Sequence, residues 1–242
     1  MIYLEGASKR LTRGESCFEL QIPAVHIEAG QLVALVGSSG CGKSTLLDML
    51  ALIMAPTQSD RFELEVTALE VRYDVRQLWL IRAEAQLARL RRNYLGYVLQ
   101  TGGLLPFLSV RDNIMLPAQI KGVAGAEQRL MALAERVGLS GYLDRLPEDL
   151  SIGQRQRAAI LRALVHSPQV LLADEPTAAV DKTQAHNIID VMHTLAEDAA
   201  VAVVIVTHDI DLVADRADLT YTFHTEQVSS HRTRSVCYPL GH

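Results

Sequence analysis

The chain has 242 residues, of which 49% are hydrophobic and only 5% aromatic, so we expect a sizeable core built mainly of aliphatic side chains. Its formal net charge of -5 at pH 7 argues against a nucleic-acid binder that works through a broad basic face. Its three scattered cysteines argue against a disulfide framework and favour a reducing cytoplasm.

Strand and helix signals alternate along the chain, which is typical of an α/β fold. An aliphatic run predicts a buried strand at 32–36, followed by a helix at 45–54 that ends before Pro56. The next predicted elements are a strand at 62–66, a helix at 82–93 and a short strand at 95–99.

Between the first predicted strand and helix, the segment 37–45 fits the pattern G-x-x-x-x-G-K-[S/T] of a phosphate-binding P-loop. The glycines of such a loop let backbone N–H groups turn toward the β- and γ-phosphates, and the helix directs its positive N-terminal end at them. Lys43 would add a positive charge and the Ser44 hydroxyl would coordinate Mg²⁺. A chance match to a glycine-rich turn is the alternative, and the flanking strand and helix argue against it. The predicted nucleotide-binding residues are Gly37, Ser38, Ser39, Gly40, Cys41, Gly42, Lys43, Ser44 and Thr45.

Cys41 is the residue of this loop with thiol chemistry of its own. Oxidation there would obstruct the phosphate site, although a thiol at such a position more often only packs. We expect the thiol to react with thiol reagents in the empty protein and to be protected by MgATP.

Only helix signals are found from 101 to 166, which suggests a helical subdomain inserted into a nucleotide-binding core. One helix is predicted at 126–137, with Gly138 as its natural C-terminal stop. A second helix is predicted at 151–166, where Pro168 ends it.

Two aliphatic runs, 170–173 and 201–206, are typical of central parallel strands. The first ends in Asp174 and Glu175 and so matches a Walker B segment. Asp174 would hold Mg²⁺ directly or through water, and Glu175 would polarise the attacking water as general base. A strand that ends in an acidic turn is the alternative, and the P-loop argues against it. Between the two runs, a stripe at helical spacing predicts a helix packed on the sheet, formed by Ile188, Val191, Met192 and Leu195.

The segment 150–154, Leu-Ser-Ile-Gly-Gln, resembles the Leu-Ser-Gly-Gly-Gln signature of the ATP-binding subunits of ABC transporters. The order of motifs is also similar to that family: the P-loop, Gln100 after an apolar strand, the signature, the Walker B segment, Asp181, and His208 after the last aliphatic run. The resemblance covers nearly the whole chain. It implies an α/β fold with a P-loop NTPase (RecA-like) core, an antiparallel β region and an inserted α-helical subdomain. The expected boundaries of this single ABC ATPase domain are 1–100 and 167–242 for the nucleotide-binding core and 101–166 for the helical subdomain with the signature.

The resemblance also implies roles for these residues. Gln100 would sense Mg²⁺ and the γ-phosphate, and His208 would contact the γ-phosphate; with Glu175 they are the expected catalytic residues. The expected metal ligands are Ser44, Gln100 and Asp174. Asp181 would lie at a dimer interface, and Ser151, Gly153 and Gln154 would close over the ATP of a second copy of the chain. The helix that begins at the signature offers an anion site. In this family the P-loop and the signature lie too far apart to meet on one subunit, so a complete site would need two chains with ATP and Mg²⁺ between them.

Two positions depart from the family pattern. Ile152 stands where the signature usually has a second glycine, which puts close approach of the backbone to the phosphate in question, while Ser151 and Gly153 are retained. Leu11 stands where the family usually stacks an aromatic residue on adenine, and Phe18 is a candidate substitute. Without stacking, the phosphate contacts would carry most of the affinity.

The stretch 95–106 and the following 110–114 are similar to the lipoprotein-releasing and macrolide-exporting ATPases of the family. We therefore expect an ATPase that works as a homodimer on a separate, permease-like integral membrane subunit, without a nucleic-acid partner. The apolar segment 104–108 is the expected docking site for that subunit, although burial in the helical subdomain is the simpler interpretation.

We expect the protein to be cytoplasmic and peripheral on the inner face of the cell membrane. The N-terminus lacks the apolar stretch of a signal peptide, and the strongest apolar run, 201–206, is far below the ~20 residues of a membrane span. The chain ends soon after that run, so no appended regulatory domain is expected. A mechanotransmission or signalling complex, a soluble ABC ATPase that acts on DNA or ribosomes, and a simple phosphotransferase remain the alternatives.

Overall fold

A computed structural model describes residues 1–66, 69–178 and 180–240, with the side chains of 195–199 left out. Its strands are β1 (Ile2–Arg13), β2 (Ser16–Ile27), β3 (Leu32–Val36), β4 (Arg61–Val66), β5 (Val71–Asp74), β6 (Leu95–Val98), β7 (Val170–Asp174), β8 (Ala202–Thr207), β9 (Leu219–Ser229) and β10 (Arg232–Pro239). Its α-helices are α1 (Lys43–Leu50), α2 (Val75–Leu80), α3 (Glu84–Tyr94), α4 (Val110–Lys121), α5 (Ala126–Arg136), α6 (Ile152–Leu164) and α7 (Lys182–Ala199). Two short 3₁₀ turns, Ser140–Tyr142 and Pro147–Asp149, lie between α5 and α6.

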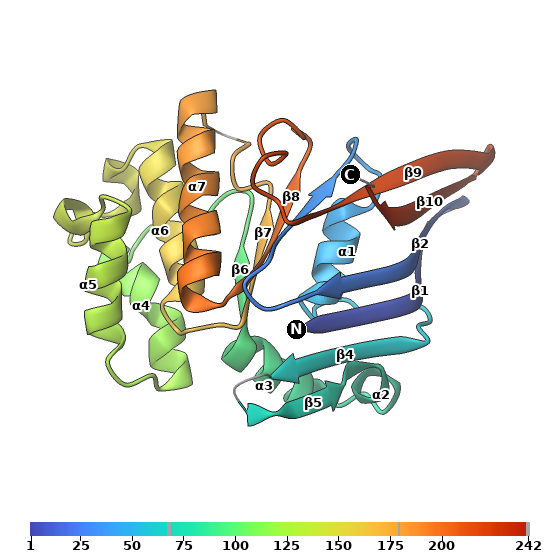
Figure 1. Cartoon of the computed structure of the whole chain (residues 1–242), viewed down its shortest axis with the longest axis horizontal. Coiled ribbons are helices and arrows are strands. Elements are labelled where there is room, and N and C mark those ends of the chain that lie inside the picture. Colours follow the sequence, from blue (N-terminus) through green and yellow to red (C-terminus); the bar gives the residue numbers. More distant parts are fainter. Residues whose placement is uncertain (67–68, 179, 241–242) are drawn as a thin grey trace.

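The described strands form one curled sheet in the order β5-β4-β1-β2-β10-β9-β3-β8-β7-β6 (Figure 1). The strands β3, β8, β7 and β6 pair in parallel, and β9 joins β3 in the same direction. The strands β1, β2, β4 and β5 pair with one another in antiparallel fashion, as do β9 and β10. The sheet therefore combines a parallel nucleotide-binding half with the antiparallel region that the family resemblance implied.

Helices cover both faces of the parallel half. Along β3, Val33 and Leu35 pack into a core cluster with α1 and α3, whereas Leu32, Ala34 and Val36 pack into a second cluster with α6 and α7. A strand with helices on both faces is buried throughout, which explains its uninterrupted aliphatic sequence. A third cluster joins α4, α5 and α6, which Figure 1 shows grouped at one end of the molecule.

The structure corrects several sequence-based boundaries. The helix expected at 45–54 begins at Lys43 and ends at Leu50, since Leu52 adopts a left-handed backbone with φ of 56°. The run 201–206 does not form the last core strand, because β9 follows it and pairs with β3. The strands β1, β2, β9 and β10 were not predicted individually. Their side chains are largely exposed toward the hairpin ends, so no continuous apolar alternation marks them.

The helical stripe in α7 is confirmed where the structure describes it: Ile188 and Met192 are buried and Val191 packs against the same cluster. The side chain of Leu195 lies outside the described residues. Within the described part of the chain, every helix falls short of the length and apolar character needed to cross a membrane.

Candidate functional site

The phosphate loop joins the carboxyl end of β3 to the first turn of α1. Gly40 and Gly42 both adopt left-handed backbone conformations, with φ of 77° and 109°, and Gly42 caps the helix. Only glycine adopts such angles without steric cost, so the sequence spacing produces the local turn. The Lys43 side chain is almost fully buried and its Nζ donates to the carbonyls of Gly37 at 2.7 Å and Ser38 at 2.8 Å. Its positive charge is therefore held at the loop by its backbone.

Cys41 is buried, with 2% of its surface exposed. A Cβ added to Gly37 would lie 2.8 Å from its Sγ, and Ser235 donates to its carbonyl at 2.7 Å. The expectation that this thiol is accessible in the nucleotide-free protein is thus wrong. The thiol packs against Gly37, and the bond from Ser235 on β10 to the Cys41 carbonyl helps to anchor the loop on the sheet.

Five predicted polar residues gather at the carboxyl ends of the neighbouring strands. The Ser44 hydroxyl donates to Asp174 Oδ1 at 3.1 Å. Gln100 Nε2 donates to Glu175 Oε2 at 3.3 Å, and His208 Nδ1 lies 3.8 Å from the same oxygen. Since β3, β8, β7 and β6 are parallel neighbours, the residues that follow them meet at one edge of the sheet, where ligands bind in open α/β folds.

Glu175 has a strained backbone, with φ of 44°. A non-glycine residue in the left-handed region costs on the order of 1–3 kcal/mol and is retained at functional sites. Its N–H donates to the carbonyl of Val206 at 3.1 Å, which fixes the carboxylate beside Gln100 and His208. No sequence pattern indicates this strain.

Burial raises the pKa of Asp174, and the nearby carboxylates of Glu175 and Asp48 raise it further. The bond from Ser44 and the charge of Lys43 act in the opposite direction. The carboxylate thus lacks full compensation of its negative charge, which is the electrostatic environment of a cation ligand.

Sequence reasoning did not identify two further residues beside this site, Tyr97 on β6 and Asp48 on α1. The Tyr97 hydroxyl donates to Asp48 Oδ1 at 3.0 Å. Burial, and then the charges of Asp48 and Asp174, raise the pKa of Tyr97, so the phenol stays neutral and remains a donor. Their separation by nearly fifty residues hides the pair in the sequence.

A cavity of about 240 Å³ adjoins the phosphate loop, and both Leu11 and Phe18 line it. These two residues are directly opposite each other in the β1–β2 hairpin. The Phe18 ring also approaches the loop, since a Cβ on Gly42 would lie 3.2 Å from its Cζ. The structure thus places both candidate base-contacting residues next to the phosphate loop.

The signature residues lie at the start of α6. Ser151 and Gln154 form a capping box: Gln154 N–H donates to Ser151 Oγ at 3.2 Å, and Ser151 N–H donates to Gln154 Oε1 at 2.8 Å. Ile152 is 49% exposed, so its side chain points to solvent and not into the core. Among the described residues, no hydrogen bond or ion pair joins Ser151, Gly153 or Gln154 to the phosphate loop.

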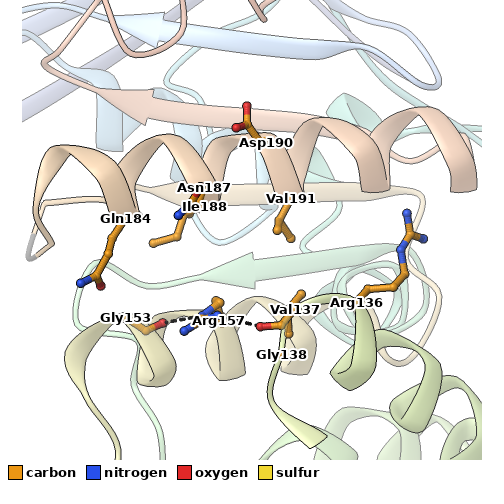
Figure 2. Close-up of a pocket in the computed structure, with 10 residues that line it drawn as sticks. All are labelled: Arg136, Val137, Gly138, Gly153, Arg157, Gln184, Asn187, Ile188, Asp190 and Val191. Atoms are coloured by element: carbon orange, nitrogen blue, oxygen red, sulfur yellow. Dashed lines mark hydrogen bonds between the residues drawn. The ribbon is translucent and has the colours of Figure 1, made fainter.

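Within the chain, Gly153 of the signature lies against Gln184 of α7. Figure 2 shows Gln184 extending from α7 toward Gly153, beside a cavity of about 410 Å³, and a Cβ on Gly153 would lie 2.2 Å from Gln184 Oε1. Asp181 caps α7, where its carboxylate accepts from the Gln184 N–H at 3.0 Å. Asp181 and the signature are thus neighbours through Gln184.

An apolar groove of about 530 Å³ lies between α3, α4, β6 and α6. Leu105 lines it, with Leu116, Pro117 and Ile120 of α4. Phe107, two residues after Leu105, is 74% exposed. The segment 104–108 is therefore divided: part of it packs against the helices, and Phe107 is open to a partner.

Comparison with known proteins places this arrangement in a family. The family profile described as "ABC transporter" matches residues 20–178. The chain is 40% identical over 191 residues to the lipoprotein-releasing system ATP-binding protein LolD of Hydrogenovibrio crunogenus, covering 78% of each chain. It is 38% identical over 224 residues to the macrolide export ATP-binding/permease protein MacB of Rhodopirellula baltica, covering 90% of this chain and 31% of that protein. The chain thus spans less than a third of the length of that second relative.

Solved structures agree. The dimeric structure of a bacterial ABC transporter cassette matches with a TM-score of 0.76 and 30% identity, covering 92% of this chain and 94% of that one. A post-hydrolysis state of an ATP-binding cassette bound to ADP and Pi matches with a TM-score of 0.77 at the same identity and coverage. This chain therefore belongs to the ABC transporter family, as an ATP-binding and ATP-hydrolysing subunit.

Proposed function

We propose that two copies of this chain bind two ATP molecules between them, each between the phosphate loop of one copy and the signature helix of the other. The observation that carries this proposal is the separation within one chain: the polar cluster lies at the carboxyl ends of the strands, and the capped start of α6 makes no hydrogen bond to it among the described residues. A capped helix start with exposed Ser151 is available to the phosphates of another copy. The dimeric cassette among the matching structures supports this arrangement.

The donor set fits Mg²⁺. The Ser44 hydroxyl and the Asp174 carboxylate are hard oxygen ligands in direct contact, and Mg²⁺ is usually held by one or two such groups together with substrate phosphates. Within the described residues, no group of three or more His, Cys, Asp or Glu side chains forms an all-protein metal cage, which agrees with a cation held largely by the nucleotide. Gln100 would complete the set. The cation would neutralise charge on the transferred phosphoryl group.

In hydrolysis, Glu175 would act as general base toward the attacking water. Gln100 and His208 both lie at the Glu175 carboxylate, so they would orient that water and the γ-phosphate in the same small volume. Lys43 and the backbone N–H groups of the loop would hold the β- and γ-phosphates. Asp181, the residue that caps α7, would contact the second copy beside its signature.

We further propose that residues 101–166 form the helical subdomain and that its groove receives a segment of a separate membrane subunit. The relatives, an ATP-binding protein of a lipoprotein-releasing system and an ATP-binding/permease protein, support a membrane partner. The protein would then act at the inner face of the cell membrane. A complex that transmits movement to an envelope process without transport is the second candidate, favoured by the likeness to the lipoprotein-releasing relative.

The decisive test is Glu175→Gln. The variant should bind ATP normally, because the phosphate loop is intact, and should hydrolyse it ~10²–10⁴-fold more slowly, because the general base is lost. With ATP and Mg²⁺ it should accumulate as a dimer in size-exclusion chromatography. Glu15→Gln, at a glutamate whose side chain is 88% exposed in the β1–β2 turn, is the matched control and should hydrolyse ATP at the wild-type rate. A monomer of Glu175→Gln in saturating MgATP would refute the two-copy site.

A further inference from the structure

Arg162, near the end of α6, is bonded to the chain that follows Gln100. Its two terminal nitrogens donate to successive carbonyls, Nη1 to Gly103 at 2.7 Å and Nη2 to Gly102 at 2.8 Å. Such paired bonds use the planar fork of the guanidinium, which fixes direction as well as distance. Gln100, two residues before Gly102, donates to the Glu175 carboxylate.

The backbone at these carbonyls is shaped to meet the guanidinium. Gly102 and Gly103 both adopt left-handed conformations, with φ of 72° and 60°. A Cβ on Gly103 would lie 2.8 Å from Leu99 Cδ1, so a side chain there would have to displace its neighbour. Two successive left-handed glycines turn both carbonyls toward α6, where the Arg162 guanidinium donates a hydrogen bond to each.

The same side chain reaches two other parts of the molecule. Arg162 lines the apolar groove between α3, α4 and α6. It also lies on the helix that begins beside Ser151, about three turns earlier. Burial lowers the pKa of Arg162, so its charge is partly removed from water and the two carbonyls help to compensate it. The groove, the signature helix and the Gln100 segment therefore meet at one side chain.

We propose that Arg162 is a positioning residue that ties the Gln100 segment to α6, so that Gln100 reaches Glu175 only while α6 holds its place against the core. This proposal rests on the proposed ATPase function of the site. A displacement of α6, whether from the groove or from the signature, is then transmitted to the Gln100 amide through two hydrogen bonds. In this role Arg162 acts through Gln100 and takes no direct part in the reaction.

The test is a double-mutant cycle on the full-length protein. Arg162→Gln should lower kcat for ATP hydrolysis by ~100-fold, the effect of a displacement of about 1 Å at a catalytic group, and should change the affinity for MgATP less than ~3-fold because the phosphate loop is untouched. In a Gln100→Ala background, Arg162→Gln should change kcat less than ~2-fold. Residues that act through one another are non-additive, whereas independent effects multiply.

Arg162→Lys repeats the cycle in a variant that keeps the positive charge and one of the two bonds, in case Arg162→Gln does not fold. Its kcat should lie between those of the wild type and Arg162→Gln. In the Gln100→Ala background, Arg162→Lys should likewise change kcat less than ~2-fold. Lys121→Met is the matched control, since Lys121 Nζ also donates to backbone carbonyls, those of Asn93 at 2.6 Å and His166 at 2.8 Å, without contacting the Gln100 segment. Its effect on kcat should be the same with and without Gln100.

Equal fold-losses from Arg162→Gln in both backgrounds, or no loss in either, would overturn the proposal. Those results differ from failure of the proposed function, in which Glu175→Gln would hydrolyse ATP as fast as the wild type.

Discussion

Leu11 lines the cavity that Phe18 and the phosphate loop also line, and we propose that this cavity receives the base of the nucleotide. Leu11→Tyr should raise the affinity for ATP by ~3–10-fold, because an aromatic stacking pair is worth about 0.5–1.5 kcal/mol beyond its buried area. Nucleotide titration would measure this gain. Tripolyphosphate, which has no base, is the control ligand and its affinity should not change. An equal gain for both ligands would show that the substitution acts on the phosphate loop and not on base recognition.

At the level of single residues, contiguous motifs were the predictable part of the site. Gly40, Gly42 and Lys43 follow from a pattern that is local in the chain, because each glycine is needed for its own backbone angle. The strain at Glu175 and the packing of Cys41 were not predictable, since both depend on strands that are distant in sequence. The Cys41 carbonyl is bonded to Ser235 of β10, an element that carried no clear sequence signal.

The helix α6 begins with a capping box and ends where His166 joins it to β6. His166 is almost fully buried, and its Nε2 lies 3.0 Å from the carbonyl of Leu95. A carbonyl only accepts, so Nε2 carries a proton. Burial, assisted by the charge of Lys121, lowers the pKa of His166 from 6.5 to about 4. The neutral ring is thus part of the contact between helix and sheet.

This contact predicts a loss of stability in acid. Above pH 6.5 the ring is neutral in both states, and as pH falls from 6.5 to 4 the unfolded chain takes up a proton that the folded chain refuses. The free energy of unfolding should therefore fall by about 3 kcal/mol across that window from this group, and no further below it. His166→Gln keeps a donor for the Leu95 carbonyl without titrating, so urea unfolding at pH 7.5 and pH 4.5 should show a smaller difference than in the wild type. An unchanged difference would contradict this role.

Helices and strands with a regular hydrophobic pattern were predictable as elements, but the residues at which they begin and end were not. The stripe of α7 and the aliphatic runs of β3 and β8 are long and regular, and the structure contains each of them. The end of α1 depends on the left-handed backbone at Leu52, where the chain turns because of packing against the core and not because of a glycine or proline at that position.

Across the whole molecule, the parallel half could be predicted and the antiparallel half came only from the family resemblance. Central parallel strands are buried on both faces and so carry continuous apolar sequence. The β1–β2 hairpin and the β9–β10 hairpin project beyond the core, and polar residues occupy both faces of their ends. Pairing of β10 with β2 brings the last strands beside the first, and no local pattern encodes that long-range contact.

The groove between α3, α4 and α6 is the surface where the proposed membrane subunit would meet the ATPase. It has mostly apolar lining that includes Leu105, and Phe107, two residues further along the chain, is 74% exposed. Phe107→Ser should weaken co-purification of the membrane subunit, since a central aromatic anchor often contributes 2 kcal/mol or more to an interface, roughly a 30-fold loss of affinity. The basal ATPase rate should stay near that of the wild type, because the Phe107 side chain is mostly exposed and belongs to none of the core clusters found among the described residues.

Leu80→Ser is the control for this prediction. Leu80 ends α2, is 63% exposed and lies outside the segment 104–108, so its replacement removes a similar exposed apolar surface at another site. Association should survive in this variant. Equal association of Phe107→Ser and the wild type would exclude Phe107 from the docking surface, and loss of the basal ATPase together with association would show that Phe107 supports the fold. A selective loss of association, with hydrolysis retained, is the outcome expected if the groove receives the membrane subunit and Arg162 carries its movement to the site of hydrolysis.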